Sequence, residues 1–180
     1  MTARFMMWWP AGRPPDAPDP ATIASQVEAF RALEGVVEVV YLRSPGDAAT
    51  TVRLEAALRI AYPSARITHQ HLMQECPGSS AGESAPFHYI VATDVRPEVE
   101  DDFNAWYERE HLPGLAGVPG TARAQRLRND DDAPRYHACY DLVNAETLGS
   151  PAWLAVRGTP WSSLVRPAFC NTTRLMMRRL

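Results

Sequence analysis

The sequence predicts an α+β fold made of two similar modules, each an antiparallel sheet with helices on one face. Three observations support this prediction. Residues 87–180 show strand and helix patterns in the order β-α-β-β-α-β. A Gly-, Ser- and Pro-rich segment at residues 77–86 is the predicted linker, and it separates this half from residues 1–76. Short sequence echoes at matching places in the two halves indicate that one module was duplicated.

The C-terminal half begins with a strand and a long helix. Phe87 to Thr93 is rich in β-branched and aromatic residues, which favour a strand. Pro97 suits the first turn of a helix, and the acidic residues that follow it favour the positive end of the helix dipole. Because a proline disfavours the helical conformation of the residue before it, we expect this helix to end at or just before Pro113.

The remainder of this half is expected to hold a hairpin, an interrupted helix and a last strand. The expected elements are a turn at 117–120, a strand at 122–128, a loop at 129–134, a strand at 135–142, a helix at 145–156, a break at 158–160, a short helix at 161–165 and a strand at 171–179. Two helices on one face of such a sheet make the ferredoxin-like arrangement. The uncovered face of the sheet would need a partner.

The N-terminal half, residues 1–76, is predicted to be a degenerate copy that serves mainly as that partner. The expected elements are a strand at 4–9, a helix at 20–33, a strand at 36–42, a remnant of a third strand at 44–52, a helix at 54–61 and a strand at 66–74. The segment 33–36 resembles 115–118, and 41–43 resembles 126–128.

Charge and hydropathy exclude several classes of function. The net charge is −3, so no basic field would attract nucleic acid or an anionic membrane. No stretch approaches the ~20 apolar residues of a membrane span. All 18 basic residues are arginine, which excludes lysine Schiff-base chemistry and a phosphate-binding P-loop lysine.

The cysteines indicate a reducing compartment. Cys76, Cys139 and Cys170 are odd in number and widely spaced, with no CxxC pair. The apolar run from Phe5 to Trp9 is too short for the core of a signal peptide. We therefore expect a cytoplasmic protein.

The most informative motif lies near the end of the first C-terminal helix. Helical spacing predicts Phe103, Tyr107 and His111 on one row, and Phe103, Trp106 and Glu110 on the next. An imidazole and a carboxylate would then lie beside an aromatic wall, which is a suitable floor for a small-molecule pocket.

His111 is the predicted proton carrier, because an imidazole has an ordinary pKa of ~6.5. The alternative is an imidazole that caps the last carbonyls of its own helix. Glu110 could orient His111 or bind substrate, or it could be solvated or paired with an arginine. Trp106 and Tyr107 are candidates for lining the pocket, although aromatic residues at helical spacing are usually core.

Further candidate site residues come from the strands and from the second helical region. Tyr136 and Tyr140 share one strand face, where a phenol could orient or protonate a substrate oxygen or simply be buried. Arg126 could bind a carboxylate or enolate, or belong to a solvated face. Trp161 could supply stacking surface, and His88, at the start of a central strand, is a further candidate for substrate binding.

No metal or cofactor is predicted. His69 and His71 share a strand face, as two metal ligands could, but no third ligand lies nearby in the sequence. A haem would need His111 or this pair as its axial ligand, and nothing in the spacing requires one.

The motif also resembles a known family. Trp106-Tyr107-x-x-Glu110-His111-Leu112-Pro113, followed by Gly117-Val-Pro-Gly120 and an arginine-rich strand, resembles the EthD-like branch of the dimeric α+β barrel superfamily. The resemblance covers most of residues 86–180 and continues through Arg135-Tyr136, Tyr140, Ser150-Pro-Ala152, Thr159-Pro-Trp161 and Arg166-Pro-x-Phe169.

This resemblance implies a barrel of two ferredoxin-like modules packed sheet to sheet, here both in one chain, with a pocket between sheet and helices. The superfamily includes cofactor-free monooxygenases acting on anthrone-like aromatics, polyketide cyclases, muconolactone-type isomerases and haem proteins. The resemblance therefore predicts the fold of this chain more directly than it predicts the reaction.

The sequence thus predicts a small cofactor-independent enzyme acting on an aromatic, polyketide-like or lactone substrate. His111 would transfer the proton, Tyr136 or Tyr140 would hold the substrate oxygen, and Trp106 with Trp161 would stack on the ring. The alternatives are a non-catalytic ligand-binding or assembly protein and, third, a haem-dependent protein. A homodimer is a possible partner arrangement, because the sequence leaves open whether the barrel closes within one chain or between chains.

Overall fold

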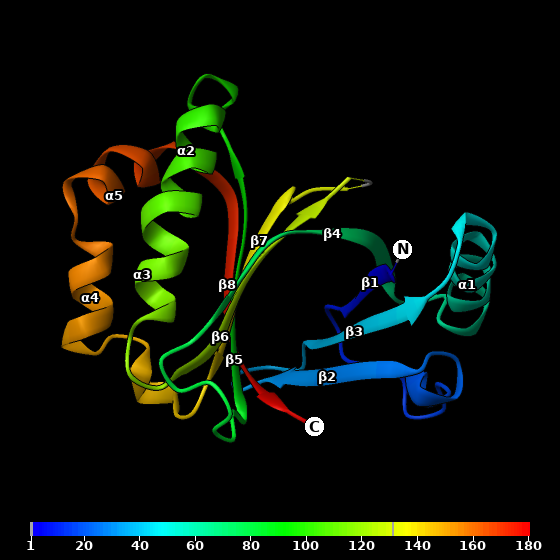
Figure 1. The fold of residues 1–180 in the computed structure, drawn as a ribbon. Helices are drawn as coiled ribbons and strands as arrows, with labels where there is room; N and C mark the ends of the chain where they lie inside the picture. The colour runs from blue at the N-terminus through cyan, green and yellow to red at the C-terminus, as the bar shows by residue number, and fades with distance from the viewer. Residues whose placement is uncertain (1, 131) are drawn as a thin grey trace. The chain divides into compact units, whose positions relative to one another are not determined.

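The computed structural model describes residues 2–130 and 132–180, and these contain eight strands and five α-helices (Figure 1). Met1, in the predicted N-terminal half, and Asp131, in the predicted hairpin loop, lie outside the described residues. The chain divides into a first unit, the residues up to His71 with Arg178–Leu180, and a second unit, Leu72–Met177. In the part of the chain that is described, no helix has the length and apolar character needed to cross a membrane.

The second unit has the β-α-β-β-α-β order that the sequence predicts. Its sheet has the strand order β8-β5-β7-β6. The central strand β7 pairs antiparallel with both β5 and β6. The strands are β5 (Phe87–Val95), β6 (Thr121–Asn129), β7 (Tyr136–Leu142) and β8 (Phe169–Arg179). The α+β class and the antiparallel sheet are therefore confirmed.

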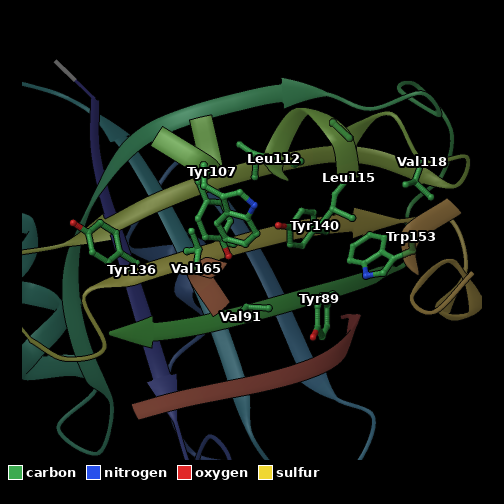
Figure 2. Close-up of a cluster of buried hydrophobic side chains, with 14 of the residues drawn as sticks. Tyr89, Val91, Tyr107, Leu112, Leu115, Val118, Tyr136, Tyr140, Trp153 and Val165 are labelled. Atoms are coloured by element: carbon green, nitrogen blue, oxygen red, sulfur yellow. The ribbon is translucent and has the colours of Figure 1, made fainter. Parts of the chain in front are cut away.

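Helices α2 to α5 lie on one side of this sheet (Figure 1). They are α2 (Glu100–Trp106), α3 (Leu112–Ala116), α4 (Pro151–Arg157) and α5 (Pro160–Val165). Their apolar side chains pack on alternate residues of β5 and β7, such as Tyr89, Val91, Tyr136 and Tyr140, to form one buried cluster (Figure 2). The helices and this sheet face thus enclose the core of the unit.

Side-chain caps mark the starts of α4 and α5. The Ser150 hydroxyl accepts a hydrogen bond from the Trp153 N–H, and the Thr159 hydroxyl accepts one from the Ser162 N–H. Each cap is followed by a proline at the first helical position, where its missing N–H costs nothing. The helix predicted over 145–156 is correspondingly split into a 3₁₀ turn, Ala145–Thr147, and α4.

The first unit has a sheet with the order β4-β1-β3-β2. Its elements are β1 (Thr2–Trp9), β2 (Gln26–Ala32), β3 (Glu38–Pro45), α1 (Ala48–Ala61) and β4 (Arg66–Pro77). Numbered along each unit, both sheets have the order 4-1-3-2. The first unit, however, has the element order β-β-β-α-β and lacks a helix between its first two strands.

The helix predicted over residues 20–33 is wrong. A 3₁₀ turn at Pro20–Thr22 and strand β2 occupy this segment, and β2 pairs with β3. Five prolines between residues 10 and 20 prevent a helix from forming before β2, because each removes a helical hydrogen bond. The apolar spacing of Ile23, Val27 and Phe30 resembled a helix, but pairing with β3 fixes the segment as a strand.

The strand remnant predicted over 44–52 is also wrong. Strand β3 ends at Pro45, and α1 begins at Ala48, six residues before its predicted start. The Asp47 carboxylate accepts a hydrogen bond of 2.8 Å from the Thr50 N–H and caps this helix.

Candidate active site

A widened helical turn positions His111. Residues Tyr107–His111 form a π-helical turn, in which the Leu112 N–H bonds to the Tyr107 carbonyl five residues earlier. Pro113 explains this turn, because its ring would crowd the carbonyl of residue 109 in a regular α-helix and it has no N–H to offer. The helix does not end before Pro113, as predicted; it continues as α3 to Ala116.

The π turn changes which side chains face one another. Residues five apart now share a face, so the His111 ring stacks on Trp106 with centroids 4.0 Å apart and an interplanar angle of 22°. Tyr107 meets His111 edge-on at 5.2 Å. The prediction that Glu110 lies beside Trp106 assumes a regular α-helix and stays a prediction. Glu110 accepts a hydrogen bond of 2.6 Å from the Thr159 hydroxyl.

A cavity lies between the sheet and the helices at this point. Its volume is about 30 Å³, enough for about two waters, and it opens to solvent. His111 and three arginines line it together with an aromatic wall of Tyr89, Trp106, Tyr107, Tyr140, Trp153 and Phe169. Figure 2 shows Tyr89, Tyr107, Tyr140 and Trp153 around this region. Four of the predicted site residues, His111, Trp106, Tyr107 and Tyr140, are therefore brought together.

His111 is neutral in this environment. Its residue is 7% exposed. Burial, followed by the positive charges of Arg166, Arg157 and Arg126, lowers the pKa of His111 from 6.5 to about 3. Its Nδ1 is buried and has no hydrogen-bond partner among the described residues. The alternative that His111 caps its own helix end is not observed, because the helical conformation continues beyond it.

The phenols at the cavity stay protonated. Burial raises the pKa of Tyr140 well above its usual value and that of Tyr107 to about 12. The Tyr140 hydroxyl is buried without a hydrogen-bond partner in the described part of the chain, as are the indole N–H groups of Trp106 and Trp153. Buried polar atoms normally have partners, so a concentration of unpaired donors on one cavity indicates a place for a polar ligand.

Tyr136 and Arg126 lie elsewhere on the same sheet face. The Tyr136 hydroxyl donates a hydrogen bond of 2.6 Å to Glu100, and Tyr136 stands apart from Tyr140 in Figure 2. Arg126 is 2% exposed, donates to the Asn104 side-chain oxygen at 2.6 Å and lies against three aromatic rings. Arg126 lines a second hollow of about 240 Å³ with Met73, Gln74, Asn104 and Glu108.

Trp161 and His88 are also away from the cavity lining. The Trp161 indole N–H donates to Asp102 at 3.0 Å. His88 alternates with the cavity residue Tyr89 along β5, so it faces the other side of the sheet. There its Nδ1 lies 2.7 Å from Asp141, which also binds Arg123.

The sequence reasoning missed the three arginines of the cavity, Arg157, Arg166 and Arg174. A signal for them exists. Residues 147–180 contain five arginines and neither Asp nor Glu. An arginine with no acidic neighbour in its own segment needs a partner from elsewhere, and such residues are candidates for binding an anion.

The described residues are expected to lack a metal site, and the arrangement of the potential ligands bears on this. Across residues 2–130 and 132–180, no group of three or more His, Cys, Asp or Glu side chains is placed to hold a metal ion. The rings of His69 and His71 are 5.0 Å apart in the first unit, without a third ligand of this kind.

Comparison with known proteins shows the fold. No protein-family model matches the sequence, and no curated protein matches it. An anthrone oxidase-like protein of known structure has a TM-score of 0.66 at 10% identity, over 99% of this chain and 91% of the other. A ferredoxin fold protein related to antibiotic biosynthesis monooxygenases, from Listeria monocytogenes, has a TM-score of 0.63 at 10% identity, over 100% and 96%.

A heme-degrading enzyme from Listeria monocytogenes is also similar, with a TM-score of 0.57 at 11% identity, over 98% of each chain. Sequence identity this low supports a shared fold and nothing finer. The ferredoxin-like prediction is therefore confirmed at the level of the fold.

Proposed function

We propose that this protein is a small enzyme of the monooxygenase type that acts without a bound cofactor on an aromatic or polyketide-like substrate. The observation that carries this proposal is the buried imidazole of His111, stacked on Trp106 in an aromatic cavity with its Nδ1 unpaired among the described residues. The names of the similar structures, anthrone oxidase-like and related to monooxygenases, support the class of reaction.

In this proposal, His111 accepts a proton from a carbon or hydroxyl group of the bound ring. The proton moves to the imidazole, and the electron pair stays on the substrate as an enolate or phenolate. The protonated phenol of Tyr140 donates a hydrogen bond to the developing oxyanion, which stabilises it in a site of low dielectric. Trp106 and Trp153 supply the apolar walls that hold the ring.

The oxidation step that follows balances with molecular oxygen alone. The carbanion of a CH₂ group adds O₂ and forms a C–O bond. The O–O bond then breaks as this carbon loses its second proton and becomes a carbonyl, and the other oxygen leaves as water with that proton and the one returned from His111. Isomerisation, cyclisation or elimination would need only the proton transfer and its return from His111.

A non-catalytic binding protein is the second candidate, and one observation favours it. With a pKa of about 3, His111 is a weak base unless a ligand changes its surroundings. In that case the cavity would bind an aromatic ligand without turnover.

Oxygen uptake with anthrone tests the first proposal against the second. Wild-type protein should oxidise anthrone to anthraquinone with one O₂ consumed per turnover. His111→Ala should lower the rate by about 10²–10⁴-fold with an ordinary melting curve, because the proton acceptor is lost. Unchanged turnover in a normally folded His111→Ala protein would refute the catalytic role, and ring binding without oxygen uptake by the wild type would favour the binding protein.

The duplicated, EthD-like arrangement is part of this proposal. The common 4-1-3-2 strand order of the two units supports descent from one module, with the N-terminal helix lost to prolines. Light scattering on the purified chain tests it: a monomer supports a barrel that closes within one chain, and a dimer supports one that closes between identical chains.

A further inference from the structure

We propose that the cavity takes an anionic aromatic molecule, a planar ring that carries a carboxylate or an ionised phenol or enol, bound by Arg157, Arg166 and Arg174. This inference rests on the proposed function for the place where the substrate lies, and it adds the charge of that substrate.

The three arginines converge on the cavity from separate elements. Arg157 is the last residue of α4, Arg166 begins the 3₁₀ turn Arg166–Ala168, and Arg174 lies in β8. All three line the same cavity as His111. Their convergence is a property of the fold, since neither a single helix face nor a single strand face joins them.

These arginines have no carboxylate partner in the described part of the chain, unlike those arginines of the unit that are paired with an acid. Arg123 binds Asp141, Arg135 binds Glu100 and Arg128 binds Asp130. By contrast, no ion pair joins Arg157, Arg166 or Arg174 to any acid within residues 2–130 and 132–180. Their mutual repulsion is appreciable: burial, then the charges of Arg157 and Arg174, lowers the pKa of Arg166.

A bound anion would relieve this repulsion. Three cations beside a cavity of low dielectric interact more strongly with an anion there than they would in water. Guanidinium groups also match the planar geometry of a carboxylate, to which they can donate two hydrogen bonds. The aromatic wall provides surface for a ring and the arginines provide the counter-charge, so the two together select an aromatic anion.

Entry of the ring requires the cavity to widen, because its volume is about 30 Å³. The arginines are the side chains suited to this motion. Arg174 is exposed, and Arg157 and Arg166 are half-buried on flexible stems. Their reorientation needs no change of the backbone.

The anion would also prepare His111 for proton transfer. The arginine charges that lower the pKa of His111 would be offset by the ligand charge, so binding would raise that pKa towards the range in which an imidazole is an effective base. The enzyme would therefore be a weak base when empty and a stronger one with its substrate bound.

Calorimetric titration with matched compounds tests the inference. The probes are 2-naphthoate, its neutral isostere 2-naphthamide, and 2-naphthol at pH values below and above its own pKa. We expect 2-naphthoate to bind at least about tenfold more tightly than the amide. Binding of 2-naphthoate should weaken as salt is added, and 2-naphthol should bind more tightly when ionised.

Arginine variants identify which positive charge binds the carboxylate of 2-naphthoate. Arg166→Gln should lower the affinity for 2-naphthoate to that for the amide and leave amide binding unchanged, and Arg157→Gln is the second variant if the first melts abnormally. The matched control is Arg96→Gln, because Arg96 is exposed, pairs with Glu98 and is not part of the cavity. It should bind 2-naphthoate as the wild type does.

Three results would overturn the inference: equal affinity for 2-naphthoate and the amide, the same loss in Arg96→Gln as in Arg166→Gln, or no binding of 2-naphthoate at millimolar concentration. Its failure is separable from failure of the proposed function. Oxidation of neutral anthrone without any preference for anions would contradict only the inference, whereas arginine-dependent binding of 2-naphthoate without turnover of any ring would contradict only the enzyme.

Discussion

Two buried histidines lie on opposite sides of the second unit's sheet, and their environments shift their pKa values in opposite directions. His88 is buried, but its hydrogen bonds to Asp141 and Cys139 outweigh that burial and raise the pKa of His88 to about 9. His111 is buried beside arginines, and the pKa of His111 falls to about 3. At pH 7 the first is a cation and the second is neutral.

The difference shows that burial alone does not determine the charge of an imidazole; the nearby ionised groups do. On the His88 side, a carboxylate balances a histidine and Arg123, as in a structural network. On the His111 side, three arginines surround a neutral ring with no acid paired to them in the described residues. The first arrangement is complete without a ligand, and the second gains stability from one.

The largest expected effect on stability comes from the side of the sheet where Asp141 balances His88 and Arg123. Asp141→Asn should lower the free energy of unfolding by about 3–5 kcal/mol, because it leaves the buried His88 and Arg123 charges without their carboxylate. Denaturant unfolding measures this. Asp130→Asn, which breaks the exposed pair with Arg128, is the control and should cost under about 1 kcal/mol. Equal losses in the two variants would contradict the structural role of Asp141.

The pH dependence of stability should show two opposite contributions. His88 has a raised pKa, so its contribution is full below pH ~6.5 and is lost as the pH rises through about 9. His111 has a lowered pKa, so stability is lost as the pH falls from ~6.5 towards 3. The contribution is about 3 kcal/mol for His88 and about 5 kcal/mol for His111.

Unfolding curves recorded across this pH range test the direction of both contributions to stability. His88→Gln should flatten the alkaline side of the profile, and His111→Gln should flatten the acid side. An acid side unchanged by His111→Gln would show that His111 has an ordinary pKa in the folded protein.

A smaller effect is expected for His111→Gln at pH 7. The variant should lower the unfolding free energy by about 1–2 kcal/mol, because it replaces a buried ring stacked on Trp106 with an amide that has no partner in the described chain. Thermal melting measures it. A loss as large as that of Asp141→Asn would indicate a structural histidine instead of a site residue.

The smallest effect is expected for Glu110→Gln. An amide oxygen can still accept the hydrogen bond from Thr159, so stability should change by under about 0.5 kcal/mol and turnover should not change. Parallel melting and oxygen-uptake measurements check both. A marked loss of turnover with normal melting would show that Glu110 takes part in substrate binding or catalysis.

The sequence predicted most of the second unit, because its strands alternate and its prolines and glycines lie at element ends. It could not predict the π turn: spacing rules assume 3.6 residues per turn, and Pro113 altered that spacing just where Trp106 and His111 meet. The prediction of a helix over 20–33 failed because pairing with β3 overrode an apolar spacing typical of helices. Arg157, Arg166 and Arg174 belong to three different elements, so the sequence shows an excess of arginine there but only the fold shows that they converge.

The central claim is a neutral His111 held in an arginine-lined cavity and activated by an anionic ligand. Nuclear magnetic resonance titration of the histidine imidazoles, with the His111 signal assigned through His111→Gln, tests it most directly. The account predicts a His111 signal that remains neutral well below pH 6 in the free protein and titrates at higher pH when 2-naphthoate is bound. A His111 signal that titrates near its ordinary ~6.5, with or without the ligand, would contradict it.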